Sequence, residues 1–232
     1  MQEPNLSRDH TERMLRWLGR PPRARDLAVP GDLSSASFLV AAALMVPGSQ
    51  VEIEAVGTNP TRTGFLDVLS AMGAGVERTE TEERNLEPSA TLAVTHGALG
   101  PTRVDGALSV RAIDELPLVA TLASQARGIT TIRDAAELRV KESDRIARTA
   151  SMLRSFGVPV DEHPDGLDVH GDPDRPLSPG HVDARGDHRI AMCGALLSRL
   201  APPGSRVEGG EAITSSFPEF HETLTALEAS PG

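Results

Sequence analysis

The chain has 232 residues, of which 39% are hydrophobic, and it carries a formal net charge of −10 at pH 7. That length fits one large domain, or one domain with part of another. The negative charge excludes a broad nucleic-acid-binding surface, which needs a basic stripe. No run approaches the roughly 20 apolar residues that span a membrane, and the first residues lack the apolar stretch of a signal peptide, so we expect a soluble cytoplasmic protein.

The first 29 residues do not follow the pattern of the rest of the chain. Residues Asp9 to Leu18 are predicted to form an amphipathic helix, and the proline-containing stretch after it a turn. A single helix of this length is only marginally stable in water. We therefore expect residues 1–29 to be the last piece of one domain and residues 30–232 to form another.

From residue 30 onward, three segments repeat one plan. Each begins with an apolar helix, passes through a Gly-containing turn into a strand, and ends with a loop and an amphipathic helix. We place the repeats at about 30–104, 105–180 and 181–232. The plan predicts an α/β (α+β) domain with pseudo-threefold symmetry. Its apolar helices, which are hydrophobic on nearly every face and therefore buried, lie within SSASFLVAAALMV, ELPLVATLASQA and HRIAMCGALLSRL.

The helices that end each repeat are predicted to lie at the surface. In the second repeat, apolar or small residues recur at helical spacing at Ile146, Thr149, Ala150 and Leu153. One face of this helix therefore packs inward and the other meets water. Alternation of apolar and polar residues, as in QVEIEAV, predicts half-buried strands between the helices.

The strongest candidate for chemistry is ELRVKESDR, residues 137–145, before the second amphipathic helix. Lys141, Glu142 and Arg145 are predicted at the helix start, with Lys141 and Arg145 one turn apart on one side. A helix N-terminus favours anions, and two cations there strengthen the preference. Lys141 is the only lysine among 23 basic residues, which reflects either a need for an ammonium group or chance. The alternative is a solvated helix start in which Glu142 simply pairs with Arg145.

Two further motifs open the other apolar helices. In GDHRIAM, Asp187 either caps the helix or lines a cleft with His188 and Arg189, and Arg189 would be costly to bury without an anionic partner. In IDELP, Asp114 is either a plain N-cap or part of the same cleft. Because the repeat plan puts both motifs at the start of equivalent helices, we expect a shared cleft.

Other polar motifs are interpreted as structural. Asp32 or Ser34 is expected to cap the first apolar helix, and Arg62 to be a surface or packing residue. The single cysteine, Cys193, is expected to pack as a small apolar side chain. The histidines show no spacing typical of a metal site, so no metal is predicted.

Seven runs of the chain occur in the same order as segments of the 5-enolpyruvylshikimate-3-phosphate synthase family and resemble them over essentially the whole length. The runs are SRDHTERML, GDLSSAS, NPTRTG, IDELP, LRVKESDRI, DHRIAM and SFPEF. The resemblance implies the two-domain enolpyruvyl transferase fold, in which each domain has three βαβαββ-like units and the active site lies between the domains. Residues 1–29 would complete the first, shikimate-phosphate-binding domain, and residues 30–232 would form the second.

The resemblance also implies a reaction. The enolpyruvyl group of phosphoenolpyruvate would pass to the 5-hydroxyl of shikimate 3-phosphate with release of phosphate, a step of the shikimate pathway in aromatic amino acid biosynthesis. Asp114 resembles the carboxylate that holds this hydroxyl and accepts its proton, and Lys141 would bind the neighbouring hydroxyls. Glu142 resembles the acid/base that exchanges a proton with the methylene of phosphoenolpyruvate. No cofactor and no metal is implied.

Five more residues resemble substrate-binding positions. Arg145 and Arg189 would clamp the carboxylate and phosphate of phosphoenolpyruvate, with His188 beside them. Ser7 and Arg8 match positions that contact the phosphate of shikimate 3-phosphate.

Two departures from the family's pattern bear on activity. Some members carry a lysine before the final FP, where this chain has Ser215, so one phosphate contact would be absent or replaced. The family's N-terminal lysine, its Gly-rich segment with a following arginine, and its Ser-Gln pair would lie before Met1. We therefore expect the chain alone to be inactive and the missing domain to be supplied elsewhere. The alternatives are a non-catalytic folded remnant and a UDP-N-acetylglucosamine enolpyruvyl transferase, which RVKESDR and IDELP disfavour.

Overall fold

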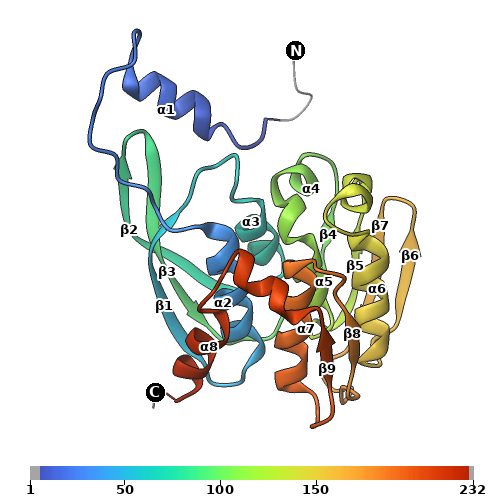
Figure 1. Cartoon of the computed structure of the whole chain (residues 1–232). Helices are drawn as coiled ribbons and strands as arrows, with labels where there is room; N and C mark the ends of the chain where they lie inside the picture. The colour runs from blue at the N-terminus through green and yellow to red at the C-terminus, as the bar shows by residue number, and fades with distance from the viewer. Residues whose placement is uncertain (1–5, 230–232) are drawn as a thin grey trace.

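The computed structural model describes residues 6–229, and three helices form the centre of the domain (Figure 1). They are α2 (Leu33–Met45), α5 (Leu116–Ala123) and α7 (His188–Leu200). The three helices pack against one another, and every residue of α5 is buried. The three apolar helices were predicted to be buried because nearly all their faces are hydrophobic, and this prediction is confirmed.

The central helices begin where the sequence supplies capping groups. The Asp32 carboxylate accepts from the backbone nitrogens of the first turn of α2, and Asp187 does the same for α7. Pro117 occupies the first turn of α5, where its missing N–H costs nothing. Inside α7, burial raises the pKa of the Cys193 thiol to about 12, which fits the predicted packing role.

Each central helix connects two parallel strands. The pairs are Gly31 with Val56 in β1 (Gln50–Gly57), β4 (Arg103–Val104) with β5 (Gly128–Ile132), and β8 (His181–Asp183) with β9 (Arg206–Glu208). The same step, a paired segment, a helix and a strand, therefore occurs three times. The helix followed by a strand is what the repeat plan predicts, whereas the paired segment before each helix was not predicted. Because β4 pairs with β5, it belongs to the second unit and not to the end of the first repeat, where the predicted bounds had placed it.

An outer helix follows each parallel pair, and two antiparallel strands then complete the first two sheets. The first unit continues with α3 (Gly64–Ala71), β2 (Gly75–Arg84) and β3 (Glu87–Thr95), and the second with α6 (Arg145–Ser155), β6 (Val160–His163) and β7 (Gly166–Gly171). The strand orders are β1-β3-β2 and β4-β5-β7-β6. The third unit ends in α8 (Phe220–Ala229), and no strand follows it within residues 6–229. Shorter helices complete the connections: α4 (Gly106–Ala112), η1 (Ile113–Glu115), η2 (Ala136–Val140) and η3 (Gly210–Ser215).

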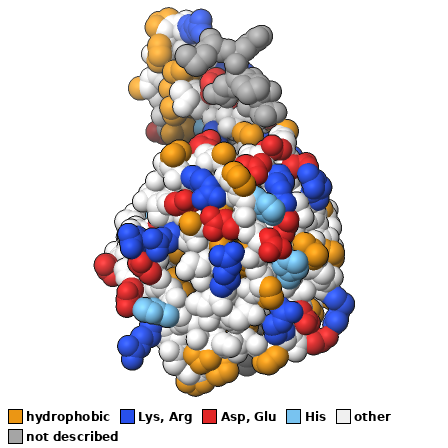
Figure 2. Space-filling view, turned by 90° about the vertical axis from the view of Figure 1, so that its right-hand side faces the viewer, with side chains coloured by type: hydrophobic (Ala, Val, Ile, Leu, Met, Phe, Trp, Pro, Cys, Tyr) orange, Lys and Arg blue, Asp and Glu red, His pale blue; other side chains and the backbone are white. Residues whose placement is uncertain are grey.

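Helix α1 (His10–Leu18) stands apart from the central helices and protrudes from the rounded body of the domain (Figures 1 and 2). None of its residues is buried, and Met14 and Leu15 are exposed. It is anchored by contacts such as the bond from Arg13 Nη1 to the Leu86 carbonyl oxygen at 2.9 Å. The predicted N-terminal helix is confirmed, whereas the domain boundary after residue 29 stays a prediction.

Candidate functional site

The N-terminal ends of α2, α5 and α7 meet on one side of the domain. Ser34, in the first turn of α2, donates its hydroxyl to Glu115 Oε1 at 2.7 Å, directly before α5. Arg189, in the first turn of α7, donates from Nη1 to the Asp114 carbonyl oxygen at 3.0 Å and from Nη2 to Ser34 Oγ at 3.1 Å. Each helix N-terminus carries partial positive charge, so three such ends together favour an anionic ligand.

Asp114 is contacted by three cations from two other parts of the chain. Its carboxylate lies 2.6 Å from Arg8 Nη2, 3.6 Å from Arg145 Nη1 and 3.8 Å from Lys141 Nζ. The side chain caps no helix, so the reading of Asp114 as a plain N-cap is wrong. Burial raises the pKa of Asp114, but Arg189, Arg8 and Lys141 outweigh it and hold the pKa below its usual range. The carboxylate is therefore ionised at neutral pH.

Lys141 lies before α6 rather than on it. Helix α6 begins at Arg145, and the Asp144 side chain caps it. Lys141 instead follows η2 with extended backbone, and its Nζ lies 2.5 Å from Glu137 Oε1. The predicted position of this motif before an amphipathic helix is confirmed, but the helical one-turn spacing predicted for Lys141 and Arg145 is wrong, because the Asp144 cap sets a later helix start. Both side chains nevertheless approach Asp114.

Arg145 is almost entirely enclosed, with a side chain that is 1% exposed. Its Nε donates to Asp187 Oδ2 at 2.9 Å, and its Nη2 to Glu142 Oε2 at 2.6 Å. Asp187 also accepts from the Ser143 hydroxyl at 2.9 Å. Burial raises the pKa of Asp187, but Arg145 and the Ser143 hydroxyl outweigh it and hold the pKa low. Asp187 is thus both the cap of α7 and the buried partner of Arg145, and Glu142 pairs with the same arginine.

His188 is the first residue of α7 and lies beside Arg189 in the chain. Burial is the largest cause that lowers the pKa of His188, and Arg189 lowers it further. The imidazole is therefore neutral at pH 7 and can exchange a hydrogen bond with an anion without adding a charge.

We expect His188 to titrate below the ordinary value of about 6.5, and Arg189→Ala to move its midpoint upward. The reason is that the substitution removes one of the charges that disfavour the imidazolium. NMR titration of the histidine rings tests this, and His188→Gln assigns the signal. Arg206→Ala, on β9, is the matched control, because it removes the same charge at a distant position. A midpoint that Arg189→Ala leaves unchanged would contradict the expected coupling.

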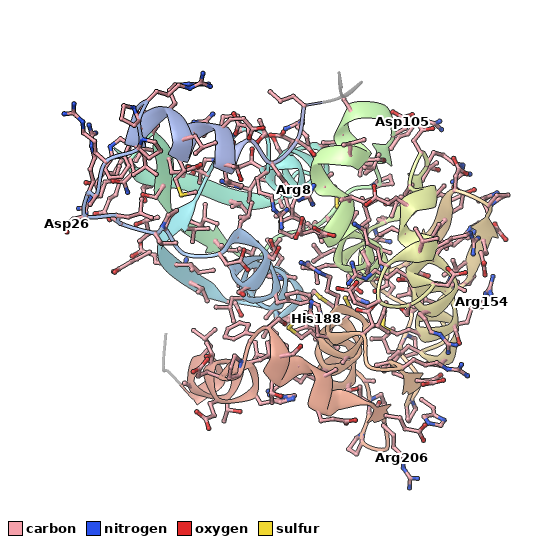
Figure 3. The ribbon with its side chains drawn as sticks, turned by 45° about the horizontal axis from the view of Figure 1, so that its top comes forward. Arg8, Asp26, Asp105, Arg154, His188 and Arg206 are labelled. Atoms are coloured by element: carbon pink, nitrogen blue, oxygen red, sulfur yellow. The ribbon has the colours of Figure 1, made fainter. Side chains whose placement is uncertain are left out.

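The N-terminal segment reaches the cluster through Arg8. Its backbone adopts the left-handed conformation, with φ at 54°, and its amide donates to the Thr61 carbonyl oxygen at 3.4 Å. A non-glycine residue held there stores strain, which is common where function fixes a side chain. Figure 3 shows Arg8 and His188 in the central part of the molecule, while four labelled charged residues lie at its periphery: Asp26, Asp105, Arg154 and Arg206.

Most of the predicted site residues form one connected set. Arg8, Lys141 and Arg145 converge on Asp114, while Glu142 joins through Arg145 and Arg189 through its bond to the backbone of Asp114. Within residues 6–229, no hydrogen bond ties the side chains of Ser7 or His188 to this set. The roles of all these residues toward substrates stay predictions.

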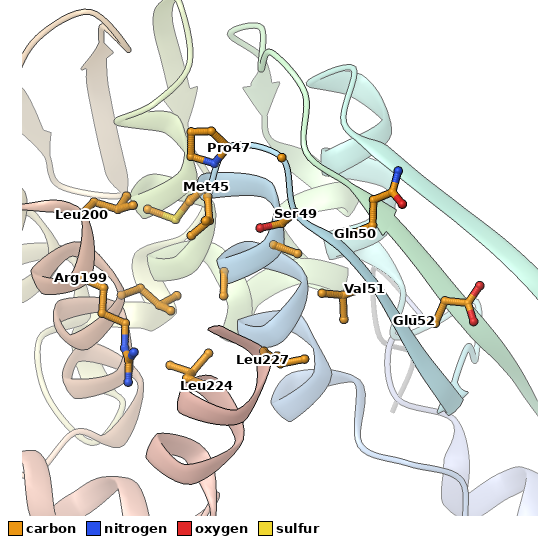
Figure 4. A pocket seen from close by; sticks show the side chains of 15 residues that line it. Met45, Pro47, Ser49, Gln50, Val51, Glu52, Arg199, Leu200, Leu224 and Leu227 are labelled. Atoms are coloured by element: carbon orange, nitrogen blue, oxygen red, sulfur yellow. The ribbon is translucent and has the colours of Figure 1, made fainter. Parts of the chain in front are cut away.

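A separate pocket of about 480 Å³ lies at the C-terminal ends of α2 and α7 (Figure 4). It is lined mainly by apolar side chains, among them Met45 at the end of α2, Leu200 at the end of α7, and Leu224 and Leu227 of α8. Helix C-terminal ends carry partial negative charge, and Arg199 is the one cation among the described residues that line the pocket, which also include Glu52, so the pocket offers fewer cations to a phosphorylated substrate than the cluster around Asp114 does. The cation cluster is the better candidate site.

The described part of the chain offers no group of three or more His, Cys, Asp or Glu side chains placed to hold a metal ion. Likewise, none of the helices within residues 6–229 is both long and apolar enough to cross a membrane. The face shown in Figure 2 carries basic and acidic side chains interspersed rather than a basic stripe.

Comparison with known proteins decides the family. Residues 8–224 match the family described as EPSP synthase (3-phosphoshikimate 1-carboxyvinyltransferase). The chain belongs to the EPSP synthase family. A 3-phosphoshikimate 1-carboxyvinyltransferase from Brevibacillus brevis is 44% identical over 240 residues, which cover 97% of this chain and 56% of the relative. One from Pelotomaculum thermopropionicum is 47% identical, covering 97% and 55%. The chain thus spans about half the length of the curated relatives it matches.

Solved structures agree with this assignment. An EPSP synthase from Acinetobacter baumannii superposes with a TM-score of 0.89 at 33% identity, covering 97% of this chain and 56% of that one. The enolpyruvyl transferase NikO from Streptomyces tendae gives 0.67 at 21% identity, covering 88% and 44%, and shares the fold. The predicted family resemblance and the enolpyruvyl transferase fold are confirmed.

In this EPSP synthase family member, the structure adds three residues that were not predicted at the site. Ser34 was expected only as a possible cap and Arg62 as a surface or packing residue, while Glu115 had no assigned role. Arg62 donates to Glu115 Oε2 from Nη1 at 2.6 Å and to Oε1 from Nη2 at 2.9 Å. Glu115 precedes an apolar helix just as Arg189 begins one, so the same signal was present there. Nothing in NPTRTG indicated that Arg62 would be buried.

Proposed function

We propose that this chain supplies one wall of an active site that transfers the enolpyruvyl group of phosphoenolpyruvate to the 5-hydroxyl of shikimate 3-phosphate. The observation that carries the proposal is an ionised carboxylate, Asp114, held among Arg8, Lys141 and Arg145 where three helix N-termini meet. Both substrates are dense anions, and fixed cations with helix ends are the groups that bind them. Membership of the EPSP synthase family supports the same reaction.

In the first step, the 5-hydroxyl attacks C2 of phosphoenolpyruvate, Asp114 takes the hydroxyl proton, and Glu142 delivers a proton to the methylene carbon. In the second step, Glu142 takes a proton back from the new methyl group, the C2–O bond to phosphate breaks, and phosphate leaves with the proton from Asp114. At the start Asp114 is ionised and Glu142 carries a proton, and both are restored to these forms at the end, so every atom and proton is accounted for by the two substrates and these two side chains. No metal or cofactor takes part in this proposed sequence.

The surroundings of Asp114 suit a base that becomes stronger on substrate binding. Arg8 and Lys141 both lower its pKa in the structure. When Arg8 contacts the phosphate of shikimate 3-phosphate and Lys141 its hydroxyls, both cations are shared with the substrate. The pKa of Asp114 therefore rises toward its ordinary value and the carboxylate accepts a proton more readily.

Arg189 and Arg145 are proposed to bind phosphoenolpyruvate, with neutral His188 beside them. Arg145 has Nε and Nη2 occupied by Asp187 and Glu142, and its Nη1, which faces the Asp114 carboxylate at 3.6 Å, is the group left to share with an anion bound beside that carboxylate. Bidentate and charge-assisted hydrogen bonds of this kind fix the orientation of a planar carboxylate or a phosphate.

Phosphate release tests the proposal. The 232-residue chain alone is expected to be inactive, because its residues form only one side of the cation cage and the positioning of two substrates is lost. Co-expressed with the unmatched amino-terminal part of the Brevibacillus brevis relative, it is expected to release phosphate from phosphoenolpyruvate only when shikimate 3-phosphate is present. Turnover by the chain alone would overturn the expected inactivity, and no activity or substrate binding in either form would overturn the proposed function.

A further inference from the structure

A fully buried glutamate connects the three central helices at the site. The Glu115 side chain is 0% exposed and is shared by two guanidinium groups, those of Arg62 and Arg189. Its Oε1 accepts from Arg189 Nη1 at 3.1 Å and from the Ser34 hydroxyl at 2.7 Å. Burial lowers the pKa of Arg62, but its hydrogen bonds to Glu115 outweigh this, so the net pKa is raised and the pair is firmly ionic. Buried charges of this kind persist only when they are paired and hydrogen-bonded.

Arg189 is held on one side and free on the other. Its Nη1 donates to Glu115 and to the Asp114 carbonyl oxygen, and its Nη2 donates to Ser34. A guanidinium has five N–H groups, and within residues 6–229 neither Nε–H nor the second Nη2–H of Arg189 donates to an acceptor. These two lie on one edge of the planar group and match a carboxylate or phosphate. The side chain is 12% exposed, so that edge is available to a ligand while the rest is fixed.

We propose that Glu115 is a positioning residue, which with Ser34 locks the Arg189 guanidinium so that its Nε–Nη2 edge meets the phosphoenolpyruvate anion. The identity of the ligand in this inference rests on the proposed function. The locked position of Arg189 rests on geometry alone. Arg62 balances the charge of Glu115 through two hydrogen bonds and also donates from Nη2 to the Ser34 hydroxyl. A binding group is held within small tolerances only when a second set of hydrogen bonds fixes its rotamer.

The charge and shape of Glu115 are both required. Glu115→Gln keeps the volume but replaces one oxygen with an NH₂ group, which faces an arginine donor whichever way the amide is turned. Either Arg62 loses its bond to Oε2, or both arginines lose their bonds to Oε1. In both orientations the guanidiniums of Arg62 and Arg189 repel each other without an intervening charge. Ser34→Ala removes the second hold on Arg189 without changing any charge.

Arginine NMR tests the locked geometry without any substrate. In the 232-residue chain, the Nη protons of Arg189 are expected to show slowed rotation about Cζ–Nη, with the signals assigned by Arg189→Lys. Glu115→Gln and Ser34→Ala are each expected to speed this rotation. Asp168→Asn, on β7, which removes the carboxylate partner of Arg133, is not. Equal rotation rates in all four proteins would overturn the proposed lock.

Phosphoenolpyruvate binding tests the functional half of the inference. Glu115→Gln is expected to weaken binding about ten- to hundredfold, because a small misplacement of a binding group is that costly. Combined with Arg189→Lys, it should add little further loss, since both changes act through one contact. Independent, additive losses, or unchanged affinity in both Glu115→Gln and Ser34→Ala, would overturn the proposal. The proposed function fails if the unsubstituted chain binds no phosphoenolpyruvate, either alone or when completed by the relative's amino-terminal part. In that case the NMR measurement still decides whether Glu115 locks Arg189.

In the completed enzyme, the same role predicts a split between kinetic constants. Glu115→Gln should raise the KM for phosphoenolpyruvate far more than the KM for shikimate 3-phosphate, because only the first substrate is assigned to Arg189. A purely structural residue would instead lower the amount of folded enzyme and leave both KM values unchanged. That second pattern would contradict the positioning role.

Discussion

Asp114→Asn is expected to lower the turnover number of the completed enzyme about 10²- to 10⁴-fold, the range that a general base contributes. The amide keeps the size of the side chain but cannot take the proton of the attacking hydroxyl. Binding of phosphoenolpyruvate should not weaken, because the substitution removes a negative charge that now neutralises Arg8, Lys141 and Arg145. The expected signature is therefore a loss in kcat without a loss in affinity.

The measurement is phosphate release under saturating substrates, together with the affinity for phosphoenolpyruvate from a binding titration. Asp105→Asn is the matched control, since Asp105 makes an exposed pair with Arg103 and has no place in the proposed site. It should retain full turnover. An Asp114→Asn enzyme with turnover near that of Asp105→Asn would show that another group is the base.

Arg145→Met is expected to lower the free energy of unfolding by about 3–5 kcal/mol, the cost of breaking a buried ion pair by removing one partner. Asp187 is 0% exposed and Arg145 1% exposed, so water cannot replace the lost guanidinium. The Asp187 carboxylate would be left with the Ser143 hydroxyl and the capped N–H of Arg189. Urea unfolding followed by circular dichroism measures the loss.

The pH dependence of unfolding separates this charge effect from simple loss of packing. The folded-state pKa of Asp187 lies below its unfolded value, so its contribution to stability is fully present above the unfolded value of about 3.9 and is lost as pH falls through the folded value. In Arg145→Met the pKa rises, and this contribution should shrink or reverse sign. Arg103→Met, which breaks the exposed pair with Asp105, should cost no more than about 1 kcal/mol. A similarly small cost for Arg145→Met would contradict the buried-pair account.

Local sequence patterns were sufficient for the helices and for part of the site. Helix α7 was expected because apolar residues cover its faces after a capping Asp187, and the structure shows that cap and that burial. The start of α6 was predicted too early. The spacing of Lys141 and Arg145 is compatible with a helix, but Asp144 caps α6, so the residues before it are not helical. Spacing alone does not reveal which of several polar residues acts as the cap.

By itself, the sequence determined the family, the three buried helices and the groups that begin them, because motifs, hydrophobic periodicity and caps are local properties of the chain. Only the tertiary structure decided that Glu115 lies between Arg62 and Arg189 with Ser34 against it, since these residues are far apart in the chain, with 155 positions separating Ser34 from Arg189. Such contacts depend on how the central helices pack and which of their ends coincide. The same packing makes Arg62 a buried ion-pair partner, a property that its flanking residues could not indicate.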